Sequence, residues 1–382
     1  MALIIETTRA HGRRILRGIG DYIRENGPWL IHVEPRSLID AAPQWLSTWD
    51  GDGIIARVVD DGSADMLAAT GIPIVNLKAS ASTSLGPADI VCDRRAVGRA
   101  AAEHLLKRGF RHFAFIGVPG IAWSDLQFDG FRIAVEGEHC GCRRYERNEE
   151  FSHRYRDGSL DEEIDEVAAW LAGLPKPLGV LAADDFLGVQ ILSGCRRAGI
   201  PVPDAVGVLG VDNDETICQL GYPPLSSIVP DDVRIGREAA GLLRELLAGG
   251  SRPEEQMLIP PLGVVTRQST DVVATDDELV AEAMRFIREN AGRGINVKDV
   301  VSAMNVSRSV LQRRFREVLN RSVYDIIVEI RVERVKELLT QSTLSLREIA
   351  ARAGFLHTEH MNSVFKQKTG WTLGRFRAEH PE

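Results

Sequence analysis

The sequence is poor in aromatic residues and cysteines and has no long apolar run. Aromatics make up 6% of the 382 residues, and there are five cysteines. No apolar run approaches the roughly 18–20 residues that span a bilayer. The first six residues, MALIIE, carry no basic stretch ahead of their short apolar run, so we expect neither a signal peptide nor a membrane span. An odd number of cysteines without an export signal argues against disulfides and predicts a cytoplasmic protein.

Several sequence patterns of catalytic sites are also missing. The chain has no phosphate-binding GxxxxGK[ST] loop, no GxGxxG opening a βα unit, no HExxH and no GxSxG. Cys140 and Cys142, beside His139, would need two further ligands from elsewhere to hold zinc. Paired carboxylates follow two apolar runs, but a binding site uses such groups as readily as a glycosidase does. We therefore expect no enzyme, no cofactor and no metal.

Negative charge dominates the chain as a whole but not its C-terminal end. The formal net charge is −8, which alone argues against nucleic-acid binding. From residue 277 to the end, however, 18 Lys and Arg stand against 14 Asp and Glu, whereas the remainder has 28 against 40. A basic end on an acidic body is expected where only one end meets phosphate.

Short apolar runs alternate with amphipathic segments over the first 268 residues. The runs are rich in Ile, Val and Leu, which is typical of strands buried on both faces, and lie at 2–5, 30–33, 53–56, 72–75, 113–117, 179–182 and 206–211. The amphipathic segments include 96–107, 164–171, 187–198 and 235–248. This alternation predicts an α/β fold of doubly wound parallel sheets in two lobes, with a ligand beyond the carboxyl ends of the strands.

The pattern changes after the polar run at 267–271. Helical periodicity extends from about 277 to 377, and no strand-like run follows. We expect a ligand-binding domain at 1–270, a linker at 271–276 and an all-α domain at 277–382.

An internal repeat divides the all-α domain. The run Lys298-Asp299-Val300 matches Arg347-Glu348-Ile349 at an offset of 49, and residues 309–316 match 359–366 at an offset of 50. Two helical units joined by a long helix at 323–339 explain this repeat most simply.

The first unit has the layout of a helix-turn-helix. A short helix at 297–304 precedes a turn at Asn305, and Ser307 is a suitable N-cap for the next helix. On that helix Leu311 and Phe315 face inward, which leaves a polar stripe on another face. Gln and Arg can make bidentate contacts to adenine and guanine edges in the major groove, and flanking arginines meet phosphates. We predict DNA contacts here at Arg308, Ser309, Gln312, Arg313 and Arg316.

The second unit repeats this layout. A helix at 346–353 leads into a turn at Gly354, which is free to adopt positive φ. The next helix buries Met361 and Phe365. We predict its DNA contacts at Thr358, Glu359, Asn362, Ser363 and Lys366. A basic stripe can also be a solvated helix face, but the duplication and the charge asymmetry together favour a double helix-turn-helix.

Residues 277–377 resemble the DNA-binding domain of the AraC family. The resemblance rests on SRSVLQRRF at 307–315, SLREIA at 345–350, Gly354-Phe355, VFKQKTG at 364–370 and RFR at 375–377. It implies that both second helices enter the major groove about one helical turn apart. Two departures matter: Leu373-Gly374 stands where the family usually has a proline, and His357 stands where a serine often caps the second recognition helix. The second unit is expected to dock less tightly than the first.

Polar residues follow the apolar runs of the first domain, where a two-lobed sensor would place a ligand. They include Arg9, Trp123, Asp125, Gln127, Asp184 and Asp212. Carboxylates accept hydroxyl hydrogens, and an aromatic ring packs on the apolar side of a sugar, so this set suits a neutral, hydroxyl-rich ligand. An Asp after a strand is equally often a helix N-cap, and both roles stay open for each carboxylate.

The first domain resembles the periplasmic-binding-protein-like sensor of LacI-type repressors. The resemblance rests on GFRHFAFIG at 109–117, IPVPD at 200–204, GVDN at 210–213 and PLSSI at 224–228. A sensor first and an AraC-type domain last is the arrangement of XylR-type xylose operon regulators. This resemblance implies sugar contacts at Asp184 and Asp212, with Arg9 and Trp123 lining the cleft. Gln127 stands where such sensors commonly have an arginine, which leaves a pentose other than xylose open.

The sequence thus predicts a sugar-controlled transcription regulator, and more specifically an activator. The expected partners are a double-stranded DNA operator, a small sugar such as D-xylose, a second subunit and RNA polymerase, with no membrane. One alternative is a transport binding protein, which the lack of an export signal and the DNA-binding end exclude. The other is a ligand-independent regulator whose sensor-like domain serves only dimerisation.

Overall fold

The computed structural model divides the chain into two compact units, an N-terminal unit, Met1–Val272, and a C-terminal unit, Val273–Glu382. The residues that it describes are 1–37, 40, 43–57, 61–77, 90–118, 121–145, 161–272, 275, 277–340, 342 and 344–379. Residues 273, 274 and 276 of the expected linker lie outside them.

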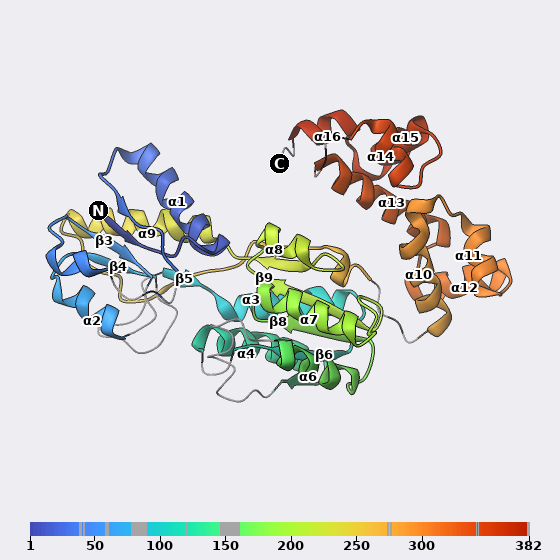
Figure 1. Cartoon of the computed structure of the whole chain (residues 1–382), viewed down its shortest axis with the longest axis horizontal. Coiled ribbons are helices and arrows are strands. Elements are labelled where there is room, and N and C mark those ends of the chain that lie inside the picture. The colour runs from blue at the N-terminus through green and yellow to red at the C-terminus, as the bar shows by residue number, and fades with distance from the viewer. Residues whose placement is uncertain are drawn as a thin grey trace. The chain divides into compact units, whose positions relative to one another are not determined.

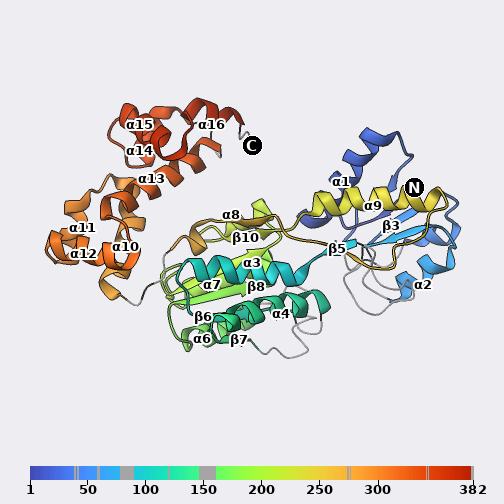
Figure 2. The ribbon, with the colours of Figure 1, turned by 180° about the vertical axis from the view of Figure 1, so that it is seen from behind.

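The first lobe of the N-terminal unit contains a four-stranded parallel sheet in the order β2-β1-β3-β4 (Figure 1). Its strands are β1 (Ala2–Ile4), β2 (His32–Val33), β3 (Ile54–Ala56) and β4 (Ile74–Asn76). Its helices are α1 (Ala10–Asn26), η1 (Gln44–Thr48), α2 (Asp61–Ala69) and, from much later in the chain, α9 (Asp232–Leu247). Helix α9 lies along α1, so residues about 220 positions apart in sequence share this lobe (Figure 2).

The second lobe contains a six-stranded sheet in the order β12-β10-β9-β8-β6-β7. Its strands are β6 (His112–Ile116), β7 (Cys142–Arg144), β8 (Leu178–Ala182), β9 (Val206–Val211), β10 (Ser226–Val229) and β12 (Gly263–Val265). Its helices are α3 (Arg94–Lys107), α4 (Ala122–Gly137), α6 (Asp161–Ala172), α7 (Asp185–Arg197), α8 (Glu215–Leu220) and η2 (Gln268–Thr270). A separate two-stranded pair joins β5 (Ile90–Cys92) to β11 (Met257–Ile259).

The predicted α/β class and the parallel, two-lobed architecture are confirmed. One strand departs from the parallel expectation, because β12 runs antiparallel to β10. The chain reaches β12 from the first lobe, after α9 and β11, and therefore enters the sheet at the end where β10 leaves it. Strands β5, β7, β10, β11 and β12 were not among the predicted runs.

Helices α3 and α4 pack unusually close together because each has a glycine at their crossing. A Cβ on Gly98 would lie 2.1 Å from the Gln127 carbonyl oxygen, and a Cβ on Gly130 would lie 2.1 Å from that of Arg95. Any larger residue at either position would force the helices apart. This approach brings the first turns of α3 and α4 together beside the first lobe.

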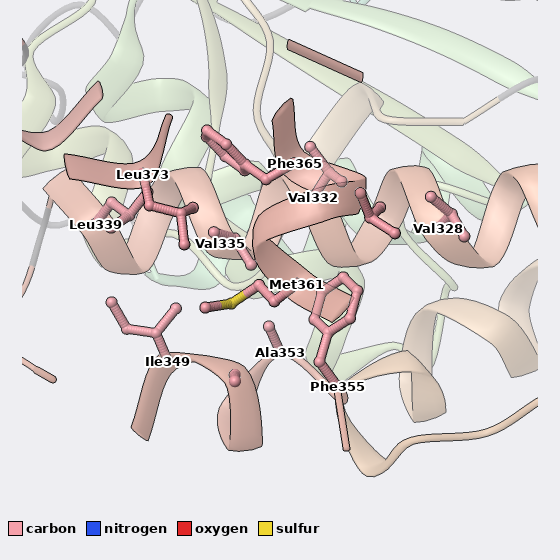
Figure 3. Close-up of a cluster of buried hydrophobic side chains, with 12 residues drawn as sticks. Val328, Val332, Val335, Leu339, Ile349, Ala353, Phe355, Met361, Phe365 and Leu373 are labelled. Atoms are coloured by element: carbon pink, nitrogen blue, oxygen red, sulfur yellow. The ribbon is translucent and has the colours of Figure 1, made fainter. Parts of the chain in front are cut away.

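The C-terminal unit is entirely helical among its described residues. Its helices are α10 (Glu278–Asn290), η3 (Ala291–Arg293), α11 (Val297–Met304), α12 (Arg308–Leu319), α13 (Val323–Thr340), α14 (Leu346–Arg352), α15 (Thr358–Thr369) and α16 (Leu373–Glu379). One core packs α10, α11 and α12 on the first half of α13 around Leu311 and Phe315. A second packs α14, α15 and α16 on its other half around Met361 and Phe365 (Figure 3). The long helix α13 thus belongs to both units of the repeat.

Two features concern the chain as a whole. All five cysteines are free. None of the helices within the described ranges is long and apolar enough to cross a membrane.

Candidate functional site

A pocket in the N-terminal unit is lined by four residues from each lobe. The first lobe contributes Glu6, Arg9, His11 and Arg57, and the second contributes Arg94, Trp123, Asp184 and Asp212. The lining therefore contains three carboxylates, three guanidinium groups, one imidazole and one indole ring. His11 lies beside a further carboxylate, with its Nδ1 2.7 Å from Asp232 Oδ1. The other charged groups of the lining balance in formal charge, which suits an uncharged polar ligand.

These side chains come from the ends of strands and the starts of helices. Glu6 follows β1, Arg57 directly follows β3, and Asp212 directly follows β9. Arg94 is the first residue of α3, which Asp93 caps by accepting a hydrogen bond from the Ala96 N–H. The carboxyl ends of parallel strands meet at one edge of a sheet, so the rule for open α/β sheets places this pocket correctly.

Glu6 and Arg57 form a buried ion pair on the first-lobe side. The Glu6 side chain is 1% exposed and its Oε1 lies 2.5 Å from an Arg57 guanidinium nitrogen. Burial alone would raise the pKa of Glu6, but the charges of Arg57 and His11 outweigh it and lower that pKa. The other oxygen, Oε2, is buried with no hydrogen-bond partner among the described residues. Glu6 therefore retains one acceptor that no described residue satisfies.

Arg94 lines the pocket from the second lobe and lies near two other lining residues. Its guanidinium lies 5.6 Å from the centre of the Trp123 ring and 3.9 Å from Asp212 Oδ1, too far for a hydrogen bond. Burial works against its charge, but Cys92 and Asp212 outweigh that effect and raise the pKa of Arg94. Arg94 Nε and Asp212 Oδ1 are both buried without a hydrogen-bond partner in the described part of the chain. Two residues that line the pocket thus retain a donor and an acceptor without partners.

Arg9 and Asp184 connect the two lobes. An Arg9 guanidinium nitrogen lies 3.4 Å from Asp184 Oδ2, while Asp184 Oδ1 accepts a hydrogen bond from the Leu187 N–H at 2.9 Å. Asp184 is therefore the N-cap of α7 and a pocket residue at once, through different oxygens. Helix capping and pocket lining, the two roles that the sequence left open for this carboxylate, are therefore compatible at Asp184.

Asp125 and Gln127 are not among the residues that line this pocket. Asp125 pairs instead with Arg144. Gln127, one turn after Trp123 on α4, is completely buried and donates a hydrogen bond to the Ala183 carbonyl oxygen at 3.2 Å. A site for an arginine-like contact exists nonetheless, because Arg94 reaches the pocket from α3.

Sequence reasoning missed Glu6, His11, Arg57 and Arg94. The strand-end rule that found Arg9 and Asp212 also applies to Arg57, the residue after the run at 53–56. Arg94 was missed because the apolar run before it, residues 90–92, is only three residues long in the sequence, so no strand was predicted there.

In the C-terminal unit the first helix-turn-helix follows the predicted caps closely. Asn305 ends α11 in the left-handed conformation, at φ 51°, and the Ser307 hydroxyl accepts a hydrogen bond from the Val310 N–H. Arg308, Ser309, Arg313 and Arg316 are exposed on α12, and Gln312 is partly exposed. Arg314, a flanking arginine of the same helix, is engaged elsewhere, since its Nε lies 2.8 Å from Asp277 Oδ2.

The second helix-turn-helix is similar but lacks one cap. Glu359, Asn362, Ser363 and Lys366 are exposed along α15, and Thr358 is partly exposed. Gly354 adopts φ +79° in the turn. His357 occupies the N-cap position without a capping hydrogen bond from its side chain, unlike Ser307 in the first unit.

Three family models match successive parts of the chain. Residues 1–87 match the XylR N-terminal domain, residues 102–270 match a periplasmic binding protein-like domain and residues 300–379 match a helix-turn-helix domain. The Xylose operon regulatory protein of Escherichia coli (strain K12) is 32% identical, over 100% of this chain and 97% of that protein. Its counterpart from Haemophilus influenzae is 31% identical, over 99% of this chain and 97% of that protein.

The chain belongs to the xylose operon regulator family. A solved structure described as the xylose-binding transcription activator xylR matches 100% of this chain and 98% of its own, with a TM-score of 0.78 and 31% identity. This member of the family is accordingly a DNA-binding transcription regulator with an AraC-type helix-turn-helix domain.

The N-terminal unit of this family member also has the fold of LacI-type regulators. The transcriptional regulator CelR in complex with cellobiose matches 70% of the chain with a TM-score of 0.55 at 20% identity. At that identity the likeness concerns the fold alone.

Proposed function

We propose that this regulator is an activator controlled by a small neutral sugar, D-xylose or a related pentose, bound between the lobes of the N-terminal unit. The observation that carries the proposal is the charge balance of the pocket, with three carboxylates opposite three guanidinium groups and one indole. A sugar phosphate or sugar acid would leave a buried charge unpaired there. A pentose brings hydroxyls that both donate and accept, and an apolar face for Trp123.

The unpaired atoms of the pocket support the same ligand. Glu6 Oε2 and Asp212 Oδ1 can accept from sugar hydroxyls, and Arg94 Nε can donate to one. They belong to different lobes, so a sugar that contacts all three binds the closed arrangement better than an open one. Such a difference in affinity is what shifts a two-state equilibrium.

The names of the relatives support the choice of sugar and the activating role. We propose that the sugar acts through a homodimer on a double-stranded DNA operator in the cytoplasm, with RNA polymerase as the further partner. Ligand contacts are assigned to Glu6, Arg9, Arg57, Arg94, Trp123, Asp184 and Asp212.

The test is thermal unfolding of the full chain with D-xylose, other pentoses, hexoses and their polyols. A sugar at about 100 times its Kd stabilises the folded state by roughly 2.7 kcal/mol, which raises the melting temperature by several degrees. Asp212→Ala should remove this shift while leaving basal operator binding intact. If no sugar shifts the wild-type chain, the proposal fails and the ligand-independent regulator takes its place.

A further inference from the structure

The loop after β9 holds two consecutive residues at positive φ, and neither is glycine. Asp212 has φ 100° and Asn213 has φ 46°. Asparagine tolerates this region, but the value at Asp212 is unusual for any L-residue and persists only where neighbouring groups enforce it. Asp212 lines the proposed sugar pocket, so the conformation of this loop determines the position of one lining side chain.

One enforcing group comes from the first lobe. Arg14, on α1, donates to the Asp212 carbonyl oxygen at 2.5 Å and to the Asn213 carbonyl oxygen at 3.4 Å. The guanidinium is itself oriented by the buried Asp232, whose Oδ2 accepts from both Arg14 Nε and a terminal nitrogen, at 2.9 and 2.6 Å. Movement between the lobes therefore acts directly on the backbone of this loop.

Two further groups hold the loop from within the second lobe. The Ser227 hydroxyl accepts a hydrogen bond from the Asn213 N–H at 2.9 Å, and Asp185 Oδ2 accepts one from the Asp214 N–H at 2.7 Å. Ser227 in turn donates to Asp185 Oδ1 at 2.5 Å. Because these two groups secure the backbone, they leave the Asn213 side chain to make a different contact.

That contact is with the last segment of the N-terminal unit. An Arg267 terminal nitrogen donates to Asn213 Oδ1 at 2.8 Å, and its other terminal nitrogen donates to the Leu225 carbonyl oxygen at 3.0 Å. Arg267 directly precedes η2, and the N-terminal unit ends five residues later at Val272. The residue next to a pocket aspartate is thus bonded to the segment that leads into the DNA-binding unit.

The same segment is clamped to the sheet, so it cannot absorb a displacement loosely. The Ser269 hydroxyl donates to the Val208 carbonyl oxygen in β9 at 2.6 Å, and the Ser226 N–H in β10 donates to Ser269 Oγ at 2.8 Å. The segment is thus fastened to β9, the strand that the 212–213 loop continues, so a displacement of the loop is shared by the segment.

We propose that Asn213 and Arg267 are the positioning residues that couple sugar at Asp212 to the DNA-binding unit. The inference rests on the proposed function, because it requires a sugar at Asp212. Closure of the lobes carries Arg14 and the 212–213 backbone together, and Asn213 Oδ1 draws Arg267 with it. Neither Asn213 nor Arg267 lines the pocket, so both should matter to the response and not to sugar affinity.

The test compares two variants at one position in the full chain. Asn213→Gly keeps positive φ without strain and removes the side-chain acceptor, whereas Asn213→Asp keeps an acceptor and tolerates the same conformation. For each, the Kd for D-xylose and the operator affinity with and without saturating D-xylose are measured. Wild-type coupling is expected in the usual range of about 5–150-fold.

In Asn213→Gly the D-xylose Kd should stay within about twofold, and the sugar-dependent ratio of operator affinities should fall toward 1. Asn213→Asp should keep the wild-type ratio. Arg267→Met should behave like Asn213→Gly, and the double variant should lose no more than either single one. Arg111→Met is the control, because Arg111 lies on the surface of the same lobe and bonds the Leu106 and Phe110 carbonyl oxygens.

An unchanged ratio in Asn213→Gly would overturn the inference, and so would the loss of D-xylose binding in that variant, because Asn213 would then belong to the sugar site. If wild-type protein binds none of the pentoses, the proposed function fails. Hydrogen exchange measured without sugar then tests whether Asn213 stabilises the segment that contains Arg267. Amides 268–272 should then exchange faster in Asn213→Gly than in Asn213→Asp. Equal exchange would also overturn the inference.

Discussion

The imidazole of His104 and the hydroxyl of Thr270 lie 2.9 Å apart in the interior and join helix α3 to the last turn of the N-terminal unit. Arg108 lies 3.1 Å from the other ring nitrogen, Nδ1. A guanidinium can only donate, so Nδ1 is the acceptor and Nε2 carries the proton donated to Thr270. Thr270 then donates to Ser226 Oγ at 2.7 Å.

This arrangement predicts that the N-terminal unit loses stability in acid through His104. Burial, aided by the charges of Arg108 and Lys107, lowers the pKa of His104 to about 3. The pKa of a histidine in an unfolded chain is about 6.5. Between about pH 3 and pH 6.5, therefore, His104 is protonated in the unfolded chain and neutral in the folded one. The stability is complete above about pH 6.5 and falls as the pH drops toward 3. Urea unfolding from pH 7 to 4 should show a shallower fall in His104→Gln than in wild type. Parallel curves would contradict this prediction.

Arg94→Met should weaken sugar binding without unfolding the lobe. The variant removes the donor that faces the pocket beside Asp212 and its stacking on Trp123. A hydrogen bond to a charged group contributes about 1.5–3 kcal/mol, so the Kd should rise roughly tenfold or more. Calorimetric titration with D-xylose measures it. Arg95→Met is the matched control, since Arg95 is exposed and pairs with Asp129 at 3.5 Å. Equal losses in both variants would remove Arg94 from the site.

Arg313→Ala should lower operator affinity by about 1–3 kcal/mol and relax selectivity at one base pair. The neighbouring Arg314 provides the comparison, because its Nε lies 2.8 Å from Asp277 Oδ2. Arg313 is 67% exposed, and its Nε lies 3.9 Å from Glu317 Oε1, too far for a hydrogen bond. Arg314→Ala should leave the base preference unchanged. Selection from a randomised operator library distinguishes them. If Arg313→Ala keeps the wild-type base preference, Arg313 does not contact a base.

His357→Ser should stabilise the start of α15. A serine at the N-cap accepts a backbone N–H, as Ser307 does for α12, and contributes about 1 kcal/mol. Native-state hydrogen exchange of the α15 amides should slow by about fivefold, while Ser307→Ala should speed exchange in α12 by a similar factor. Unaltered exchange in α15 would mean that another group already satisfies its first turn.

The parts of the fold that local chemistry controls could be predicted residue by residue. Asn305 in the left-handed turn and Ser307 at the N-cap are examples, because a cap or turn depends on a few neighbours in sequence. The α/β class could be predicted for a similar reason, since the apolar residues of each run by themselves indicate a buried strand.

The pocket could be predicted only in part, because distant pairs decide which polar side chains reach it. Arg9 meets Asp184 across 175 residues, and Glu6 meets Arg57 across 51. Gln127 lies one turn after Trp123 on α4, yet it is completely buried, and its backbone oxygen is at the close approach of α3 at Gly98. Sequence spacing gives the face of a helix but not the depth at which a neighbouring helix crosses it.

The two recognition helices are copies in backbone only. At the offset of 50 that relates the two units, Glu359 of α15 matches Ser309 of α12, and Ser363 matches Arg313. A glutamate can accept from cytosine and an arginine can donate to guanine, and at these matched positions each stands in only one of the two helices, so we predict that the two half-sites differ in sequence. An operator made of two different half-sites is asymmetric. Inverting it relative to the promoter would therefore reverse the orientation in which the regulator binds.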